Sequence, residues 1–173
     1  MTKEPTQWET EGKRAFAAGK YIEAANAFRE ASRGFTLGRD GLYAAEMNNN
    51  LSVSLLKANK PQEAFDAANG TDKTFETWGD KSKQAMALGN QAAALEAMKR
   101  NDEALDLYDR AAAIFAETGD GDMRSLVLKS AAAIRLKQGK LNDTAMDMLG
   151  SLGAVEKPNL FQRFLKFLLR FKP

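Results

Sequence analysis

The side chains that most often carry out catalysis or bind metals at neutral pH are absent from this chain. It contains no histidine and no cysteine, which removes the commonest general base, the commonest metal ligand, and every disulfide or thiolate metal site. Carboxylates, lysines, serines and tyrosines remain, but none stands in a phosphate-loop, metal-ligand or nucleophile-and-base spacing. We therefore expect no catalytic residue, no metal, no cofactor, and a protein that is not an enzyme.

One acidic motif resembles the start of a calcium-binding loop. Asp120 and Asp122 flank Gly121, but the glutamate that such a loop needs at its later position is missing. Acidic pairs elsewhere, such as Asp102 and Glu103, have the spacing of solvated helix faces. We interpret the first motif as a connector between two helices.

Small and aromatic residues recur at a spacing of 40 residues. The three series are Ala24, Ala64, Ala104 and Thr144; Gly12, Ser52, Ala92 and Ala132; and Phe35, Phe75, Phe115 and Val155. Self-similarity at a period of roughly 20 to 50 residues is typical of a solenoid, in which each unit buries its apolar face against its neighbours. The sequence therefore predicts an all-α solenoid with an extended surface for another molecule.

Each unit contains two helical patterns separated by a break. Small residues allow two antiparallel helices to approach closely, while large residues fill the flanking gaps. The connectors between units are Gly38-Arg39-Asp40, Trp78-Gly79-Asp80 and Gly119-Asp120. In each connector we expect the glycine to end one helix in a left-handed cap and the aspartate to cap the next. The predicted helices lie near 5–18, 21–36, 41–58, 61–77, 81–99, 102–117, 121–138 and 141–152.

The residue types at these offsets resemble the tetratricopeptide repeat (TPR) family. The first unit carries that pattern most fully, with Trp8, Gly12, Gly19, Tyr21, Ala24, Phe28 and Ala31. The common repeat has about 34 residues, so the longer spacing is similar to the variety found in kinesin light chains. The resemblance implies about four antiparallel helix pairs in a right-handed superhelix over 1–156, with repeats near 5–40, 45–80, 85–120 and 125–156.

In the TPR family the first helix of each pair lines the concave face, and this resemblance nominates the groove residues. The predicted peptide-groove residues are Lys13, Asn49, Asn50, Val53, Asn90 and Lys129. Asparagine is a poor interior helix former, so the run 48–50 costs helix propensity. An asparagine amide offers a donor and an acceptor, which suit the backbone of an extended peptide.

The alternative is that Asn50 and Asn90 are solvated helix-face residues and that Asn48 caps locally. The carboxylate clamp found in the family is not reproduced, because Glu9 and Met86 stand where basic residues are expected. We therefore do not expect binding of chaperone C-terminal tails.

The last residues, 157–173, depart from the repeat. On a helix, apolar side chains would cover most of the circumference beside a basic stripe; the residues expected to contact a membrane or partner are Phe161, Arg163, Phe164, Leu165, Lys166, Phe167, Leu168, Arg170 and Phe171. Such a helix would rise roughly 20 Å, too short to span a hydrocarbon layer of roughly 30 Å. A wide apolar face with basic charges is typical of a helix at a membrane interface. Capping of the last repeat, docking in its own groove, self-association and partner binding are alternatives.

The formal charge of +2 is unevenly distributed, because the last fifteen residues carry four basic residues and no acid. Removing these four charges from +2 leaves −2 for the rest, so the body lacks the basic excess of a nucleic-acid-binding domain. No apolar run resembles a signal peptide or reaches the length of a membrane-spanning helix. We expect a cytoplasmic protein, with attachment to the inner face of a membrane as an extension of that expectation.

These observations favour a non-enzymatic scaffold that binds an extended peptide or partner helix in its concave groove. The tail would tether this scaffold to a membrane surface. The alternative is a fully soluble adaptor whose C-terminal helix caps the solenoid or mediates self-association. The sequence leaves the partner and the oligomeric state open.

Overall fold

The computed structural model describes residues 3–139. Within this part all regular secondary structure is helical, and no strand occurs. The helices are α1 (Pro5–Ala17), α2 (Tyr21–Leu37), α3 (Gly41–Lys57), α4 (Pro61–Ala68), α5 (Thr71–Thr77), α6 (Lys81–Ala97), α7 (Asn101–Thr118) and α8 (Gly121–Lys137). The predicted helices 141–152 and 157–173 lie outside the described residues, as does the end of the predicted repeat 125–156.

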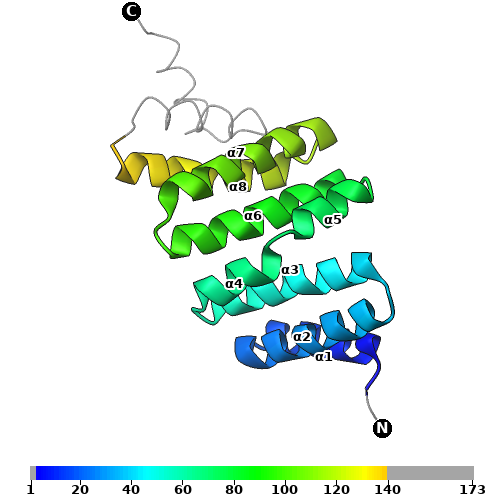
Figure 1. Ribbon diagram of the computed structural model, residues 1–173. Coiled ribbons are helices and arrows are strands. Elements are labelled where there is room, and N and C mark those ends of the chain that lie inside the picture. Colours follow the sequence, from blue (N-terminus) through cyan, green and yellow to red (C-terminus); the bar gives the residue numbers. More distant parts are fainter. Residues whose placement is uncertain (1–2, 140–173) are drawn as a thin grey trace, which may run out of the picture.

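Apart from α4 and α5, helices that follow one another in the chain pack against one another. α1 contacts α2, α2 contacts α3, α6 contacts α7, and α7 contacts α8. In the middle, α6 also packs on α3, α4 and α5. The helices are stacked in layers, with α1 and α2 at one end and α7 and α8 at the other (Figure 1). Each layer therefore covers the apolar side of the next.

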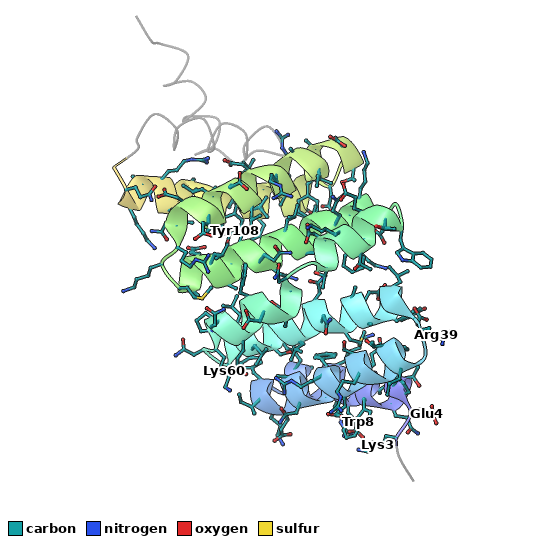
Figure 2. All side chains as sticks on the ribbon, in the orientation of Figure 1. Lys3, Glu4, Trp8, Arg39, Lys60 and Tyr108 are labelled. Carbon is teal, nitrogen blue, oxygen red and sulfur yellow. The ribbon has the colours of Figure 1, made fainter. Side chains whose placement is uncertain are left out.

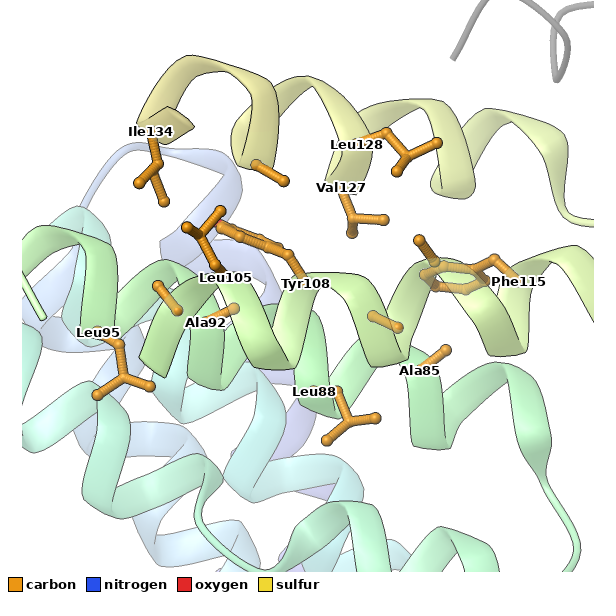
Figure 3. Close-up of a cluster of buried hydrophobic side chains, with 14 residues drawn as sticks. Ala85, Leu88, Ala92, Leu95, Leu105, Tyr108, Phe115, Val127, Leu128 and Ile134 are labelled. Atoms are coloured by element: carbon orange, nitrogen blue, oxygen red, sulfur yellow. The ribbon is translucent and has the colours of Figure 1, made fainter. Parts of the chain in front are cut away.

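The residues that recur every 40 positions form much of the buried interior. Ala24, Ala64 and Ala104 are completely buried, and Phe75 and Phe115 are at most 1% exposed. The largest buried cluster joins α6, α7 and α8, where Tyr108 and Phe115 of α7 lie between side chains of the two flanking helices; its labelled members include Leu88, Leu95, Val127 and Ile134 (Figure 3). Small residues thus lie where backbones approach, and larger ones fill the space beside them.

Gly12 shows why one of these positions has to be small. A Cβ atom at Gly12 would lie 2.8 Å from the Phe28 ring, closer than carbon atoms can approach. The absence of a side chain lets the Phe28 ring of α2 lie directly against the backbone of α1.

A left-handed backbone residue ends a helix every 20 residues. The residues and their φ angles are Gly19 (73°), Arg39 (60°), Asn59 (59°), Gly79 (74°), Lys99 (62°), Gly119 (76°) and Gly139 (73°). After the left-handed residue, the next N–H donates to a carbonyl five residues earlier: Lys20 to Ala15 at 2.9 Å and Asp80 to Phe75 at 2.9 Å. This pattern is a Schellman motif, which satisfies the last carbonyls of a helix.

The aspartate caps are confirmed. The carboxylates of Asp40, Asp80 and Asp120 accept hydrogen bonds from the backbone N–H three residues later, at 3.2, 3.0 and 3.1 Å. Each thereby satisfies one free donor at the start of α3, α6 or α8. Figure 2 shows Arg39 and Lys60 at opposite edges of the stack, one beyond each end of α3.

The expected left-handed cap at Gly38 is wrong. Gly38 has a φ of −72°, and the left-handed residue is Arg39, which follows it. The equal spacing of the left-handed positions explains the difference, because the turn must occur at the same place in each unit. The first connector has its glycine one position too early.

The prediction of a single helix over 61–77 is also wrong. α4 ends at Ala68, and Asn69 (φ −59°, ψ 124°) and Gly70 (φ 82°, ψ −6°) separate it from α5. These angles are those of the two central residues of a type II turn, which requires a positive φ at its second position. The dipeptide Asn-Gly is a turn signal, so the sequence held the evidence for this break.

Replacing Arg39 or Lys99 by glycine should stabilise the protein. A side chain in the left-handed region costs about 1 kcal/mol, which glycine avoids. We expect each of Arg39→Gly and Lys99→Gly to raise the free energy of unfolding by about 1 kcal/mol in urea denaturation. Gly79→Ala, which creates the same strain, is the matched control and should lower it. A loss of stability in both glycine variants would contradict this account.

Candidate functional site

Three of the six predicted groove residues line one hollow between α1, α2 and α3. Lys13, Asn50 and Val53 surround a cavity of about 210 Å³ together with the rings of Phe16 and Phe28. We call it the N-terminal hollow. Its volume is below the roughly 300–1,000 Å³ of sites for drug-sized molecules, so it suits one side chain of a larger partner.

The polar groups of the N-terminal hollow come from α1 and α3. The Lys13 ammonium lies 2.6 Å from the Glu9 carboxylate one turn earlier, and 64% of the Lys13 side chain is exposed. Asn50 is half-buried, and within residues 3–139 its side-chain amide makes no hydrogen bond. The hollow therefore combines two aromatic walls with an amide that is free to bind a ligand.

The three consecutive asparagines have different environments. The Asn48 side-chain oxygen accepts a hydrogen bond from the Ser32 hydroxyl of α2 at 2.7 Å. The Asn49 oxygen lies 3.1 Å from the Thr71 hydroxyl at the start of α5. Asn48 and Asn49 thus join α3 to the helices on each side of it. Of the run, Asn50 alone lines the N-terminal hollow.

Asn90 and Lys129 do not meet the other predicted groove residues in this hollow. Asn90 is half-buried on α6, and Lys129 is exposed on α8. The exposed side chains of Met86 on α6 and Leu126 on α8, 45% and 56% accessible, occupy equivalent positions one unit apart. The surface of α6 and α8 therefore carries exposed apolar side chains beside Asn90 and Lys129.

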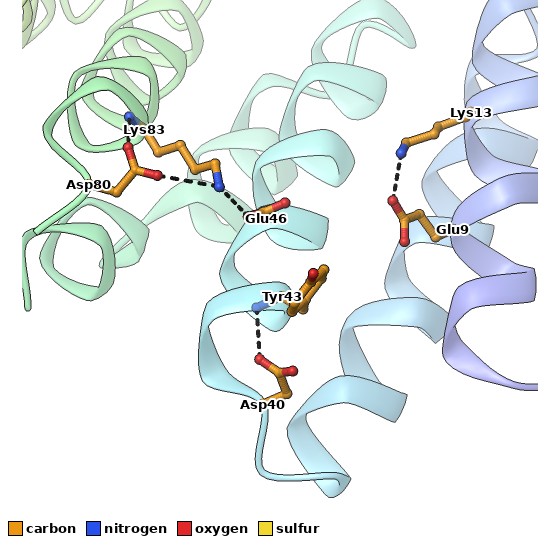
Figure 4. A network of polar contacts seen from close by, with 7 residues as sticks. All are labelled: Glu9, Lys13, Asp40, Tyr43, Glu46, Asp80 and Lys83. Atoms are coloured by element: carbon orange, nitrogen blue, oxygen red, sulfur yellow. Dashed lines mark hydrogen bonds and ion pairs between the residues drawn. The ribbon is translucent and has the colours of Figure 1, made fainter. Parts of the chain in front are cut away.

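An ion-pair network crosses the junction between α3 and α6. The Lys83 ammonium contacts the Glu46 carboxylate of α3 and lies 3.3 Å from the Asp80 carboxylate that caps α6 (Figure 4). The hydrogen bond to Glu46 raises the pKa of Lys83, which keeps the lysine charged. The network joins α3 to α6, and Glu9 and Lys13 form a separate pair on α1 (Figure 4).

A second and larger hollow, which we call the C-terminal hollow, has a volume of about 730 Å³. Its wall includes Leu56, Ala93, Ala97, Tyr108, Ile134 and Lys137. Tyr108 is only 4% exposed, and its hydroxyl donates to the Glu96 carboxylate at 2.9 Å. Burial, together with the Glu96 charge, raises the pKa of Tyr108 well above its usual value.

A buried polar cluster holds the break between α4 and α5. The Gln91 amide of α6 donates to the Ala68 carbonyl at 3.1 Å and to the Asp72 carboxylate at 2.9 Å. The Thr71 hydroxyl also lies 2.7 Å from the Ala68 carbonyl oxygen. Asp72 and Gln91 are 7% and 6% exposed, so these contacts satisfy polar groups that the turn would otherwise leave unpaired.

Sequence reasoning missed the aromatic walls of the N-terminal hollow and the Tyr108–Glu96 pair. Phe16 and Phe28 belong to the repeat pattern, and that pattern explains them equally well as core residues. Glu46 and Lys83 are 37 residues apart in the chain, so the spacing of neighbouring residues along one helix does not predict their contact. The period of 40 residues places them on neighbouring first helices of successive units, which is the only signal that could have suggested it.

Comparison with known proteins finds no matching protein-family model and no significantly similar curated protein. The resemblance to the TPR family therefore stays a prediction. Within residues 3–139, no group of three potential metal-ligating side chains occurs. In that same part of the chain, no helix is both long enough and apolar enough to cross a membrane.

Tyr108→Phe should weaken the fold and change its response to alkali. Loss of the hydrogen bond to Glu96 should lower the free energy of unfolding by about 0.5–1.5 kcal/mol at neutral pH. Because the folded protein raises the Tyr108 pKa, this tyrosine contributes stability below pH of about 10 and loses that contribution as the pH rises further. The variant should therefore lose less stability than the wild type between about pH 10 and 11. Parallel alkaline slopes in urea denaturation would contradict this assignment.

Proposed function

We propose that this protein is a non-enzymatic scaffold, built as an α-solenoid of helix pairs, that binds an extended peptide or a partner helix. The N-terminal hollow is the observation that carries this proposal. It brings Lys13, Asn50 and Val53 together from two helices, and Asn50 keeps its amide unused among the described residues. An apolar pocket beside a free amide suits a partner side chain together with its backbone.

The layered arrangement supports binding along a surface instead of binding in a closed site. The N-terminal hollow is lined by α1, α2 and α3. The C-terminal hollow is lined by α3, α6, α7 and α8, so α3 contributes to both hollows. A partner that contacted both hollows would run across successive layers. The solenoid geometry and the cytoplasmic location are part of this proposal.

Asn50→Ala should weaken peptide binding without unfolding the protein. The full chain would be panned against a random peptide library, and an enriched peptide would be measured by fluorescence anisotropy. Loss of one hydrogen bond of about 1 kcal/mol predicts an affinity about fivefold lower. Asn26→Ala on α2 is the matched control, because Asn26 is exposed and pairs only with Arg29 among the described residues. Failure to enrich any peptide, or equal loss in both variants, would contradict the proposal.

We further propose that residues 157–173, with the composition of an interfacial helix, tether the scaffold to an anionic membrane surface. The last fifteen positions of the chain carry four basic residues and no acid, which supports this. Each such charge near an anionic leaflet adds about 1 kcal/mol. The predicted contact residues from Phe161 to Phe171 lie outside the described part of the chain, so sequence alone supports this part of the proposal.

Removal of the tail should release the protein from vesicles. The full chain and a 1–157 truncation would be co-sedimented with vesicles that contain phosphatidylserine. We expect the full chain to sediment at low salt and the truncation to sediment much less. Equal sedimentation of the two would contradict the tether and would favour the soluble adaptor, in which the tail caps the solenoid or mediates self-association.

A further inference from the structure

α8 exposes a helix face on which leucines and lysines lie side by side. Leu126, Lys129, Ala133, Leu136 and Lys137 are all exposed, and their spacing of 3, 4, 3 and 1 residues places them on one side of the helix. Leu126 and Leu136 are 56% and 52% accessible. From Leu126 to Lys137 this face extends roughly 16 Å.

The charges on this face are basic and unpaired. Lys129 and Lys137 make no ion pair with any of residues 3–139, whereas the neighbouring Arg135 points elsewhere and pairs with Asp109 of α7 at 2.7 Å. The only acidic residue of α8 is Asp122, in its first turn. The exposed face therefore combines leucines with ammonium groups. It has no carboxylate of its own; the Glu96 carboxylate of α6, which lines the C-terminal hollow together with Lys137, is engaged by the Tyr108 hydroxyl.

We propose that this face of α8 binds an anionic lipid surface. Leucine side chains flanked by lysines, on a helix face that carries no acid of its own, match the interface between acyl chains and anionic headgroups. This inference rests on the proposed function in one respect: the tail, as the proposed tether, would bring α8 to the same membrane. Two weak contacts, one from the tail and one from α8, would together give stable attachment where one alone is marginal.

A lipid surface is a better match for this face of α8 than a peptide is. The N-terminal hollow offers an amide with a donor and an acceptor beside two aromatic rings, which suits a peptide backbone. The exposed charged groups on the face of α8 are both ammonium groups. Lys129, predicted above as a groove residue, is thereby reassigned to the lipid-binding face, and so is Lys137, which lies at the edge of the C-terminal hollow.

The test compares full-length variants on vesicles of equal parts phosphatidylserine and phosphatidylcholine. At low ionic strength, Lys129→Gln/Lys137→Gln should lower the partition coefficient about fivefold for each lysine removed. Leu126→Ser should lower it further, and binding to pure phosphatidylcholine vesicles should be weak throughout. Arg39→Gln/Lys73→Gln is the matched control, because it removes two exposed charges that also lack ion pairs, on the α2–α3 connection and on α5. Circular dichroism would verify that every variant folds.

The same α8 substitutions in a full-length chain with Arg163→Gln, Lys166→Gln and Arg170→Gln separate the two contacts. If the α8 substitutions lower the partition coefficient by the same factor in that background, the inference is supported. This holds even if the tail substitutions leave the partition coefficient unchanged, a result that would contradict the tether. If the α8 and control variants behave alike while the tail variant loses binding, the inference is overturned and the tether stands. Weaker binding of the selected peptide, without any change on vesicles, would overturn it in favour of a groove role for Lys129.

Discussion

The recurrence of a left-handed residue every 20 positions is the constraint on which the rest of the structure depends. It reverses the chain after each full-length helix and, in the second unit, after the pair α4 and α5; the helices of 17 residues are about 25 Å long. The accompanying Schellman hydrogen bonds pair carbonyls at the helix ends that would otherwise have no partner. Because the reversals are equally spaced, equivalent side chains return to equivalent places in successive layers. Ala24, Ala64 and Ala104 are therefore all fully buried, although they lie on different helices.

Most of the helical organisation follows from this regularity and could be predicted. Apart from the break, the observed helix ends lie within two residues of the expected ones. Two departures have local causes. The sequence places a glycine at position 38, but the geometry needs the left-handed residue at 39. At Asn69-Gly70 a turn signal overrides the helical pattern, and its burial depends on Gln91, a residue about 20 positions away that no local rule connects to it.

The candidate site was less predictable, because its geometry depends on contacts between layers. Three adjacent asparagines look equivalent in the sequence, yet Ser32 and Thr71 engage two of them and only Asn50 lines a hollow. Helix spacing can place a residue on a face, but it cannot tell which neighbouring helix already uses its hydrogen-bonding groups. The same limit applies to α8, where the pairing of Arg135 and the unpaired state of Lys129 are visible only in three dimensions.

The division of the second unit into α4 and α5 has a consequence for how the stack opens. These segments have 8 and 7 residues, well below the roughly 12–15 residues at which an isolated helix becomes marginally stable in water. Their order comes from α3 and α6, against which they pack, and from the Gln91 contacts. Amide hydrogens in α4 and α5 therefore exchange with solvent whenever α6 separates from them. Their exchange rates thus measure how often the layers around this short pair separate.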